Sequence, residues 1–290
     1  MARRRIKQAF DVFHNRLTPS GIAAGKATSH RKSIASRLER DFNLRRMFYS
    51  GSANNGTSVA RNSDIDFFAS IPTDNLKRDS SVSLREIKES LQVRFSNTKI
   101  FVDSPAVVLK FGYADWDTAE VIPADYLKMQ DGKKLYDIPD GKGGWMESGP
   151  SSHTAYVTEQ NNRLNRKLKP LIRFVKAWKY FRNAPISSFY LELRVTKLMQ
   201  TEASIVHEID LPNVFGKLAD CELAAIRDPK GISGYIQPCS SAKKSEAITK
   251  VNRAATRSRN ARQAEIDGRL ETAFDWWDKV FNDNFPSYYY

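Results

Sequence analysis

Two aspartates lie one residue apart, at Asp64 and Asp66, shortly after the pair Gly51-Ser52. Side chains alternate along a strand, so both carboxylates project from one face, with Ile65 opposite. Neighbouring carboxylates repel each other, and one of them is protonated unless a cation neutralises the pair. The pattern predicts a magnesium site beside a turn of small residues that can approach phosphates. On these residues alone, a solvated strand end and an ordinary turn remain the alternative.

Short strands are predicted to position this pair. Residues 46–50 form a strand that leads into Gly51, and residues 65–69 form a second, apolar strand. Two further strands, residues 106–112 and 118–124, are joined by a turn at residues 113–117. The second of these strands brings in the next carboxylate.

Glu120 is the only charged residue between Thr118 and Ala124. A central strand rarely holds a lone carboxylate unless that group is paired or binds a metal. Glu120 is therefore the predicted third acid of the site. Asp103, Asp115 and Asp117 are the alternatives for this role.

The rest of the chain has the apolar spacing of helices. An α/β catalytic lobe is predicted for residues 1–150 and a helical lobe for residues 151–290, with a cleft between them that holds nucleotides. A Gly-rich loop is expected at residues 141–150. The predicted helices are residues 5–17, a helix capped by Ser29, residues 80–95, residues 154–183 with an interruption near Pro170, a helix from Ser187 or Ser188, and residues 240–285.

Composition excludes several classes of protein. No run of about 18 apolar residues is present, which predicts no membrane span. Cys221 and Cys239 are not spaced as metal ligands and are expected to be plain thiols in a reducing cytoplasm. The 290 residues can form one or two packed lobes.

The net charge of +13 is unevenly distributed. Residues 1–46, 160–200 and 240–262 together carry +24, which leaves −11 on the remainder. Such clustering favours polyanionic partners, either nucleoside triphosphates or a nucleic acid. An activating RNA or DNA is accordingly predicted to bind the basic residues outside the acidic site. Solvated helix faces are the alternative. The clusters are Arg3 to Arg5, Arg31-Lys32 and Lys243-Lys244.

Several blocks together resemble one family of the DNA polymerase beta-like superfamily, the bacterial CD-NTases. Members of this family are related to the animal cyclic GMP–AMP synthase and make cyclic oligonucleotide signals in CBASS anti-phage defence. The blocks lie between about residues 45 and 230, and their order and spacing carry the resemblance. They are Gly51-Ser52 with Gly56-Thr57, residues 63–66, residues 119–124, Trp145 with Gly149-Pro150 and His153, residues 171–179, residues 187–193 and residues 226–229.

The resemblance implies an α+β fold, in which a polymerase beta-like nucleotidyltransferase lobe with a mixed sheet precedes a helical C-terminal lobe. It also implies a metal centre, with Asp64, Asp66 and Glu120 as ligands of two Mg²⁺ ions, for which Mn²⁺ is an alternative. Gly51 and Ser52 would grip the β- and γ-phosphates.

In the helical lobe, Lys176 and Ser188 correspond to residues that reach the triphosphate, and Phe189 to an aromatic that stacks on a base. For Lys176 a solvated helix lysine is the alternative, and for Phe189 a core ring. The implied partners are ATP with at least one more nucleoside triphosphate, and a separate effector protein that responds to the product.

Two other functions use some of the same features. A template-independent RNA-tailing nucleotidyltransferase would use the same metal chemistry. A non-catalytic RNA-binding relative would explain the basic charge, but it has no reason to keep three mutually repelling carboxylates. A cyclic di- or trinucleotide synthase that releases pyrophosphate is the favoured prediction.

Overall fold

The computed structural model describes residues 3–111 and 117–289. The chain divides into two compact units, one of Pro19–Ala155 and the other of Met1–Thr18 with Tyr156–Tyr290. The first helix thus belongs with the later helices, because its apolar face packs against them, whereas we had predicted residues 1–150 as one lobe. The division falls at residues 155 and 156, inside the helix α5.

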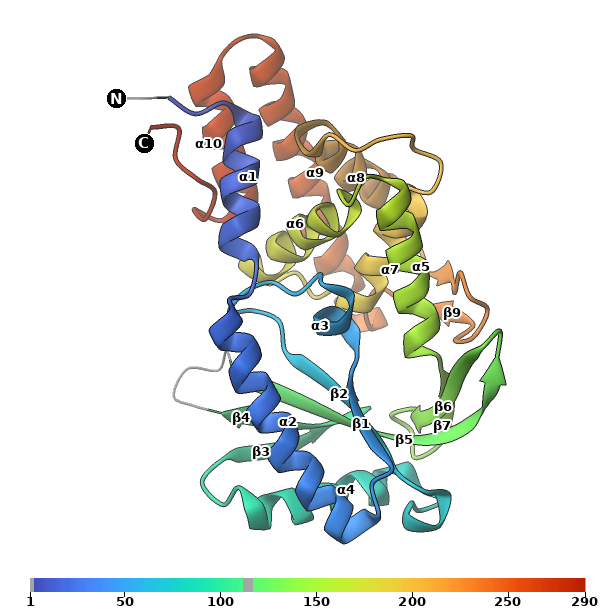
Figure 1. Ribbon diagram of the computed structural model, residues 1–290. Helices are drawn as coiled ribbons and strands as arrows, with labels where there is room; N and C mark the ends of the chain where they lie inside the picture. Colours follow the sequence, from blue (N-terminus) through green and yellow to red (C-terminus); the bar gives the residue numbers. More distant parts are fainter. Residues whose placement is uncertain (1–2, 112–116, 290) are drawn as a thin grey trace. The chain divides into compact units, whose positions relative to one another are not determined.

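The unit of Pro19–Ala155 is built on a seven-stranded mixed sheet (Figure 1). Five strands lie in the order β1-β2-β5-β4-β3, and β6 and β7 continue from β5. Among the described strands of this sheet, β2 and β5 pair in parallel and the other neighbours pair antiparallel. The strands are β1 (Arg46–Tyr49), β2 (Ile65–Ser70), β3 (Lys99–Asp103), β4 (Ala106–Phe111), β5 (Asp117–Gln130), β6 (Lys133–Pro139) and β7 (Trp145–Ser148).

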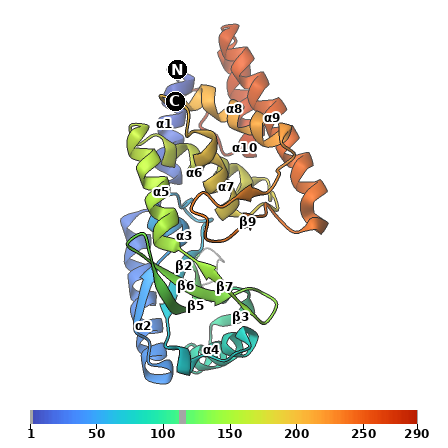
Figure 2. The ribbon, with the colours of Figure 1, turned by 90° about the vertical axis from the view of Figure 1, so that its right-hand side faces the viewer.

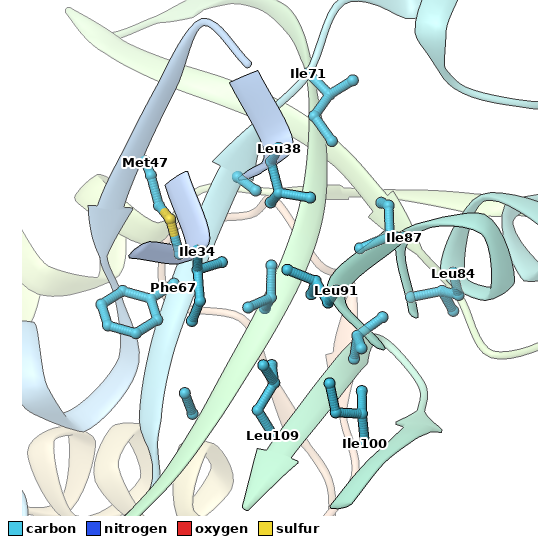
Figure 3. Close-up of a cluster of buried hydrophobic side chains, with 14 of the residues drawn as sticks. Ile34, Leu38, Met47, Phe67, Ile71, Leu84, Ile87, Leu91, Ile100 and Leu109 are labelled. Carbon is cyan, nitrogen blue, oxygen red and sulfur yellow. The ribbon is translucent and has the colours of Figure 1, made fainter. Parts of the chain in front are cut away.

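The helices α2 (Gly21–Phe42) and α4 (Ser80–Arg94) bury their apolar sides against this sheet (Figure 3). Ile34 and Leu38 are one helical turn apart on α2, so both reach the core. The core cluster also contains Met47, Phe67, Leu84, Ile87, Leu91, Ile100 and Leu109. The sheet strands that carry the predicted acids are therefore held from one face by two helices.

The strand β5 is long enough to take part in two pairings. Its first half pairs with β2 and β4, and its second half pairs with β6. Within the second half, the pairing with β6 shifts in register between Tyr126 and Lys128. A short helix, α3 (Gly51–Asn55), and the single 3-10 turn Thr73–Asn75 complete the unit together with the start of α5 (Pro150–Arg163).

The other unit is helical apart from one small ladder (Figure 2). The helix α1 contacts α6, α8 and α10, and α9 packs along α8 and α10. Edge-to-face rings from α1, α6 and α10 fill its centre, with Phe10 about 5 Å from both Phe174 and Trp277. The elements are α1 (Ile6–Leu17), α6 (Leu168–Phe181), α7 (Ser188–Leu198), α8 (His207–Asp220), β8 (Ile226–Arg227), β9 (Tyr235–Ile236), a 3-10 turn (Ser241–Lys243), α9 (Lys244–Ile266) and α10 (Leu270–Phe281).

Several predicted boundaries were wrong. The helix predicted to start at Ser29 begins at Gly21 instead, because the Ala-containing segment after Pro19 continues the helix. Gly51 opens the short helix α3, where we had expected only a turn. Trp145 lies in the strand β7 within the expected loop. The predicted interruption near Pro170 is confirmed: α5 ends at Arg163 and α6 begins at Leu168, so that Pro170 falls in the first turn of α6.

No helix among the described residues is long and apolar enough to cross a membrane.

Candidate active site

Asp66 and Glu120 lie side by side on neighbouring strands. The parallel register of β2 and β5 places Asp66 opposite Glu120, with Ile65 opposite Ala119. Residues opposite each other in neighbouring strands project from the same face, so the two carboxylates come together there. Asp64 immediately precedes β2. The arrangement gathers the three predicted acids at the start of two central strands.

The pKa of Glu120 shows that the three carboxyl groups affect one another. The pKa of Glu120 is raised from 4.5 to about 8, first by burial, then by the charges of Asp66 and Asp64 and by a hydrogen bond to Asp66. The charge of Asp103 makes the last contribution. In the absence of a cation, Glu120 therefore keeps its proton near neutral pH, and that proton lies between Glu120 and Asp66.

Gly51 is required by its contact with Asp66. Its φ is +53°, a left-handed conformation that disfavours other residues, and an added Cβ would lie 1.9 Å from Oδ2 of Asp66. The backbone N–H of Ser50 donates to the carbonyl of Asp66 at 2.9 Å. The segment between β1 and α3 is thus held against Asp66 by a backbone hydrogen bond and by the close approach of Gly51.

Ser52 lies in a network of small hydroxylated residues. Its hydroxyl accepts a hydrogen bond from the Oγ of Ser58 at 3.1 Å, and its carbonyl accepts from the N–H of Thr57 at 3.0 Å. Gly56 ends α3 in the left-handed conformation, with φ +67°. These hydrogen bonds fix the loop that follows Gly51 and Ser52.

The other carboxylates considered for the third acid are placed differently. Asp117 is the first residue of β5, and its Oδ2 lies 3.3 Å from Nε2 of His30, whose ring stacks on Phe111. Asp103 lies on β3 and is separated from β5 by β4. Asp115 lies outside the described residues. Only Glu120 is opposite Asp66 in the register.

The donor set suits a magnesium ion. Carboxylate oxygens are the ligands Mg²⁺ prefers, and it is usually bound by one or two carboxylates together with substrate phosphates and water. Across residues 3–111 and 117–289, no group of three or more histidine, cysteine or acidic side chains forms a ready-made metal cage. The raised pKa of Glu120 nonetheless marks a place where a cation would relieve repulsion. The acids therefore fit a metal that arrives with a nucleotide.

The predicted phosphate-binding residues of the helical unit differ in exposure. Lys176, on α6, is 1% exposed, and its Nζ lies 3.6 Å from Oε2 of the buried Glu192 on α7. It is therefore not the solvated helix lysine that we had weighed as its alternative. A lysine so placed stabilises the contact of α6 with α7, because either charge alone would be costly to bury.

Ser188 has partners that the sequence analysis missed. Lys179 donates to the Ser188 hydroxyl at 2.7 Å, and the Tyr180 hydroxyl lies 3.3 Å from the same oxygen. The signal for Lys179 was available, since it follows Lys176 by three residues and so lies near it on α6. Phe189 is 40% exposed and is not a core ring. Lys179, Ser188 and Phe189 thus form a polar and aromatic group at the start of α7.

Several residues of the basic clusters at residues 3–5 and 243–244 form hydrogen bonds or ion pairs within the protein. The Arg4 guanidinium donates to the carbonyls of Ser287 and Tyr289, and Lys244 donates to the carbonyl of Leu223. Lys243 lies 3.7 Å from Glu246. These contacts give some of the charge a structural role. Binding of RNA or DNA there stays a prediction.

Comparison with known families gives one match to more than half of the chain. Residues 5–161 match the family described as "Second Messenger Oligonucleotide or Dinucleotide Synthetase domain". The matched segment includes Gly51, Ser52 and all three acids of the site.

Two curated proteins are similar over most of the chain. A "Probable cyclic nucleotide synthase" of Bacillus cereus (strain VD146) is 27% identical over 230 residues, covering 78% of this chain and 69% of that protein. A "Cyclic AMP-AMP-AMP synthase" of Acinetobacter sp. (strain ATCC 27244 / 9458) is 23% identical over 259 residues, covering 82% of this chain and 72% of that protein.

Solved structures agree on the fold. CdnC of E. coli MS115-1, solved with ATP, gives a TM-score of 0.74 at 19% identity and covers 97% of this chain and 99% of that one. The Vibrio cholerae cyclic AMP-GMP synthase DncV, solved with a linear intermediate, gives a TM-score of 0.80 at 12% identity. This match covers 99% of this chain and 98% of that one. The predicted α+β fold with a helical C-terminal region is confirmed.

Proposed function

Because the chain belongs to the family of second messenger oligonucleotide or dinucleotide synthetases, we propose that it joins nucleoside triphosphates into a cyclic di- or trinucleotide, with release of pyrophosphate, as an anti-phage signal. The predicted family, a bacterial CD-NTase, and the predicted nucleotidyltransferase activity are confirmed by the match. The relatives named as cyclic nucleotide synthases support a cyclic product.

One observation carries the assignment of the site. Asp66 and Glu120 are opposite each other in the sheet, and the charges of Asp64 and Asp66 help to raise the pKa of Glu120 to about 8. Such a group is costly unless a cation is bound, so it points to a role in catalysis rather than in the core. We assign Asp64, Asp66 and Glu120 to hold two Mg²⁺ ions, for which Mn²⁺ is an alternative.

The reaction consists of repeated nucleotidyl transfers. The ribose hydroxyl oxygen of one nucleotide bonds to the α-phosphorus of another, the bond to the leaving pyrophosphate breaks, and the hydroxyl proton is lost. A last transfer within the linear product closes the ring and releases another pyrophosphate. When bound, the Mg²⁺ ions lower the pKa of the attacking hydroxyl and neutralise the pyrophosphate.

The chain's own groups position these reactants. Asp66 is held by the Ser50 N–H through its backbone carbonyl, and Gly51 leaves room for its carboxylate. Glu120 must lose the proton it holds in the empty site before it can bind a cation. Ser52 is assigned to the β- and γ-phosphates, and the short loop around it allows their close approach. These residues all belong to the unit of Pro19–Ala155.

Three residues of the helical unit are assigned to nucleotide binding on the strength of the resemblance. Ser188 would hold a phosphate oxygen together with Lys179, which already donates to its hydroxyl. The exposed ring of Phe189 is available to stack on a base. Lys176 would act in the same group, and its burial beside Glu192 means that it also fixes α6 to α7.

The decisive experiment supplies four labelled nucleoside triphosphates and Mg²⁺, treats the products with phosphatase and identifies them by mass. A small phosphatase-resistant product is expected. Labelled RNA that grows in length would indicate the RNA-tailing function instead, and the absence of any product would favour the RNA-binding one. Asp66→Asn should abolish synthesis, whereas Asp117→Asn, a change of the same kind on β5, should not.

Substrates, partners and compartment complete the proposal. ATP and at least one more nucleoside triphosphate are the proposed substrates; CdnC was solved with ATP. A separate effector protein would respond to the product. The free cysteines Cys221 and Cys239 are compatible with a reducing cytoplasm as the site of action.

A further inference from the structure

A cationic pocket of about 410 Å³ lies on the unit of Pro19–Ala155. Three of its lining cations, Lys32, Arg37 and Arg40, come from α2, and the fourth, Arg94, comes from the last residue of α4. None of them belongs to the acidic site described above. The volume is at the lower end of the range of small-molecule sites in proteins, about 300–1,000 Å³.

Helix geometry brings the donors of this pocket together. Ser29, Ser33 and Ser36 also line it and lie three or four residues apart, so they share the face of α2 that bears the cations. The opposite face, with Ile34 and Leu38, is fully buried in the core. Since α2 is fixed on its buried side, the backbone positions that carry these hydroxyl and cationic groups are fixed, while Lys32 and Arg40 themselves are exposed.

The charge of this lining is poorly balanced. Asp41 accepts from Arg37 at 2.7 Å, from Arg40 at 3.0 Å and from the Ser90 hydroxyl at 2.7 Å. Arg37 and Arg40 thus share the Asp41 carboxylate, and Lys32 and Arg94 add two further cations to the lining. Like charges held together in this way oppose folding unless an anion binds among them.

We propose that this pocket binds a small polyphosphate, of the kind found in nucleotides. Guanidinium groups bind phosphate oxygens in a bidentate geometry, and the hydroxyls of Ser29 and Ser33 add neutral donors. The Ser36 hydroxyl already donates to the Lys32 carbonyl at 3.0 Å. A nucleic-acid duplex is instead held by cations spread along its backbone. Here the cations and hydroxyls line one open pocket of limited size, which favours a compact ligand. The chemistry is shared by nucleotides and by inorganic polyphosphate.

The test is calorimetric titration of the full-length protein with tripolyphosphate and, separately, with ATP, both in EDTA. Without a divalent cation the acids of the catalytic site repel a polyphosphate, so binding there is suppressed. We expect saturable binding of one ligand per chain. Equal affinity for tripolyphosphate and ATP would mean that the pocket recognises the phosphate chain alone. Tighter binding of ATP would mean that it also contacts the nucleoside. Both outcomes support the proposal.

The double variant Arg40→Gln with Arg94→Gln should weaken binding at least tenfold. The matched control is Arg85→Gln, which removes an exposed arginine of α4 that does not line the pocket and should leave binding unchanged. Lys32→Gln, also at an exposed position, provides a second pocket variant if the double variant melts early. No binding by the wild type, or equal losses in the Arg85 and pocket variants, would overturn the proposal. So would preferential binding of a short RNA duplex that both pocket variants abolish.

Discussion

Glu120→Gln tests the cost of placing an ionisable carboxylate at a position that is both buried and close to Asp66 and Asp64. Glutamine has the shape of the protonated glutamic acid and can still donate a hydrogen bond to Asp66, but it cannot ionise. The pKa of Glu120 is 4.5 in an ordinary setting and about 8 in the folded protein. Linkage then gives a cost of about 3 kcal/mol near pH 7 for keeping a glutamate at this position without a cation.

The sign of the effect follows from the direction of the shift. The folded protein binds the Glu120 proton more tightly than the unfolded chain does. The stability contributed by this proton is full below about pH 4.5 and is lost as the pH rises through about 8. The advantage of Glu120→Gln should therefore grow from below about 0.5 kcal/mol near pH 4.5 to about 3 kcal/mol near pH 7 and about 5 kcal/mol near pH 9.

Thermal melting in EDTA at several pH values measures this advantage. About 3 kcal/mol corresponds to a rise in Tm of roughly 6–12 °C in a unit of this size. Glu89→Gln, at an exposed position on α4, is the control and should melt like the wild type at every pH. If Glu120→Gln also melts like the wild type across the series, neither burial nor the charges of Asp66 and Asp64 raise the pKa of Glu120, and the proposed metal site loses its main support.

Adding Mg²⁺ to the wild type near pH 7 should release about one proton, because Glu120 must ionise to bind the cation. The heat of binding should then depend on the ionisation enthalpy of the buffer, and this dependence should vanish in Glu120→Gln. A buffer-independent heat in the wild type would contradict the assignment of Glu120 as a ligand.

Other changes give further tests. Asp64→Asn with Asp66→Asn should abolish the product while the protein stays folded, as judged by circular dichroism; synthesis near the wild-type rate would exclude the two-metal site. Gly51→Ala should lose activity and destabilise the protein by at least about 1–2 kcal/mol, because φ is +53° and its Cβ would meet Asp66; an unchanged Tm would refute this packing. At limiting Mg²⁺ the synthesis rate should rise with pH toward the pKa of Glu120, about 8, and saturating Mg²⁺ should move this rise to lower pH; a rate that is flat with pH at limiting Mg²⁺ would speak against Glu120.

The site of the catalytic unit could largely be predicted from local pattern. Alternation along a strand placed Asp64 and Asp66, and a lone carboxylate among apolar residues indicated Glu120. The register that sets Asp66 opposite Glu120 joins segments 54 residues apart, which no local pattern encodes. The lone carboxylate of Glu120 does lie beside another acid, as expected of a buried carboxylate that needs a partner, while its role as a metal ligand stays a prediction.

The helical unit was less predictable for a physical reason. The periodicity of α1 was clear, and Ile6, Phe10, Phe13 and Leu17 are indeed buried. A buried face does not specify its partner, however, and α1 packs with α6, α8 and α10 rather than with the sheet that follows it in the chain. Likewise, Lys176 and Lys179 look alike in sequence, but only Lys176 is enclosed beside Glu192.

The same crowding that makes the acidic site unstable when empty can make it selective. Glu120 holds a proton in the empty site, so a cation must displace it, and a lone cation gains less from the site than one that brings phosphate ligands of its own. Gly51 adds no side chain beside the Asp66 carboxylate, where a Cβ would collide with Oδ2. The stability lost by placing Glu120 beside Asp66 would then be recovered when a nucleotide–metal complex binds. The catalytic geometry would accordingly be completed by the substrate rather than built beforehand.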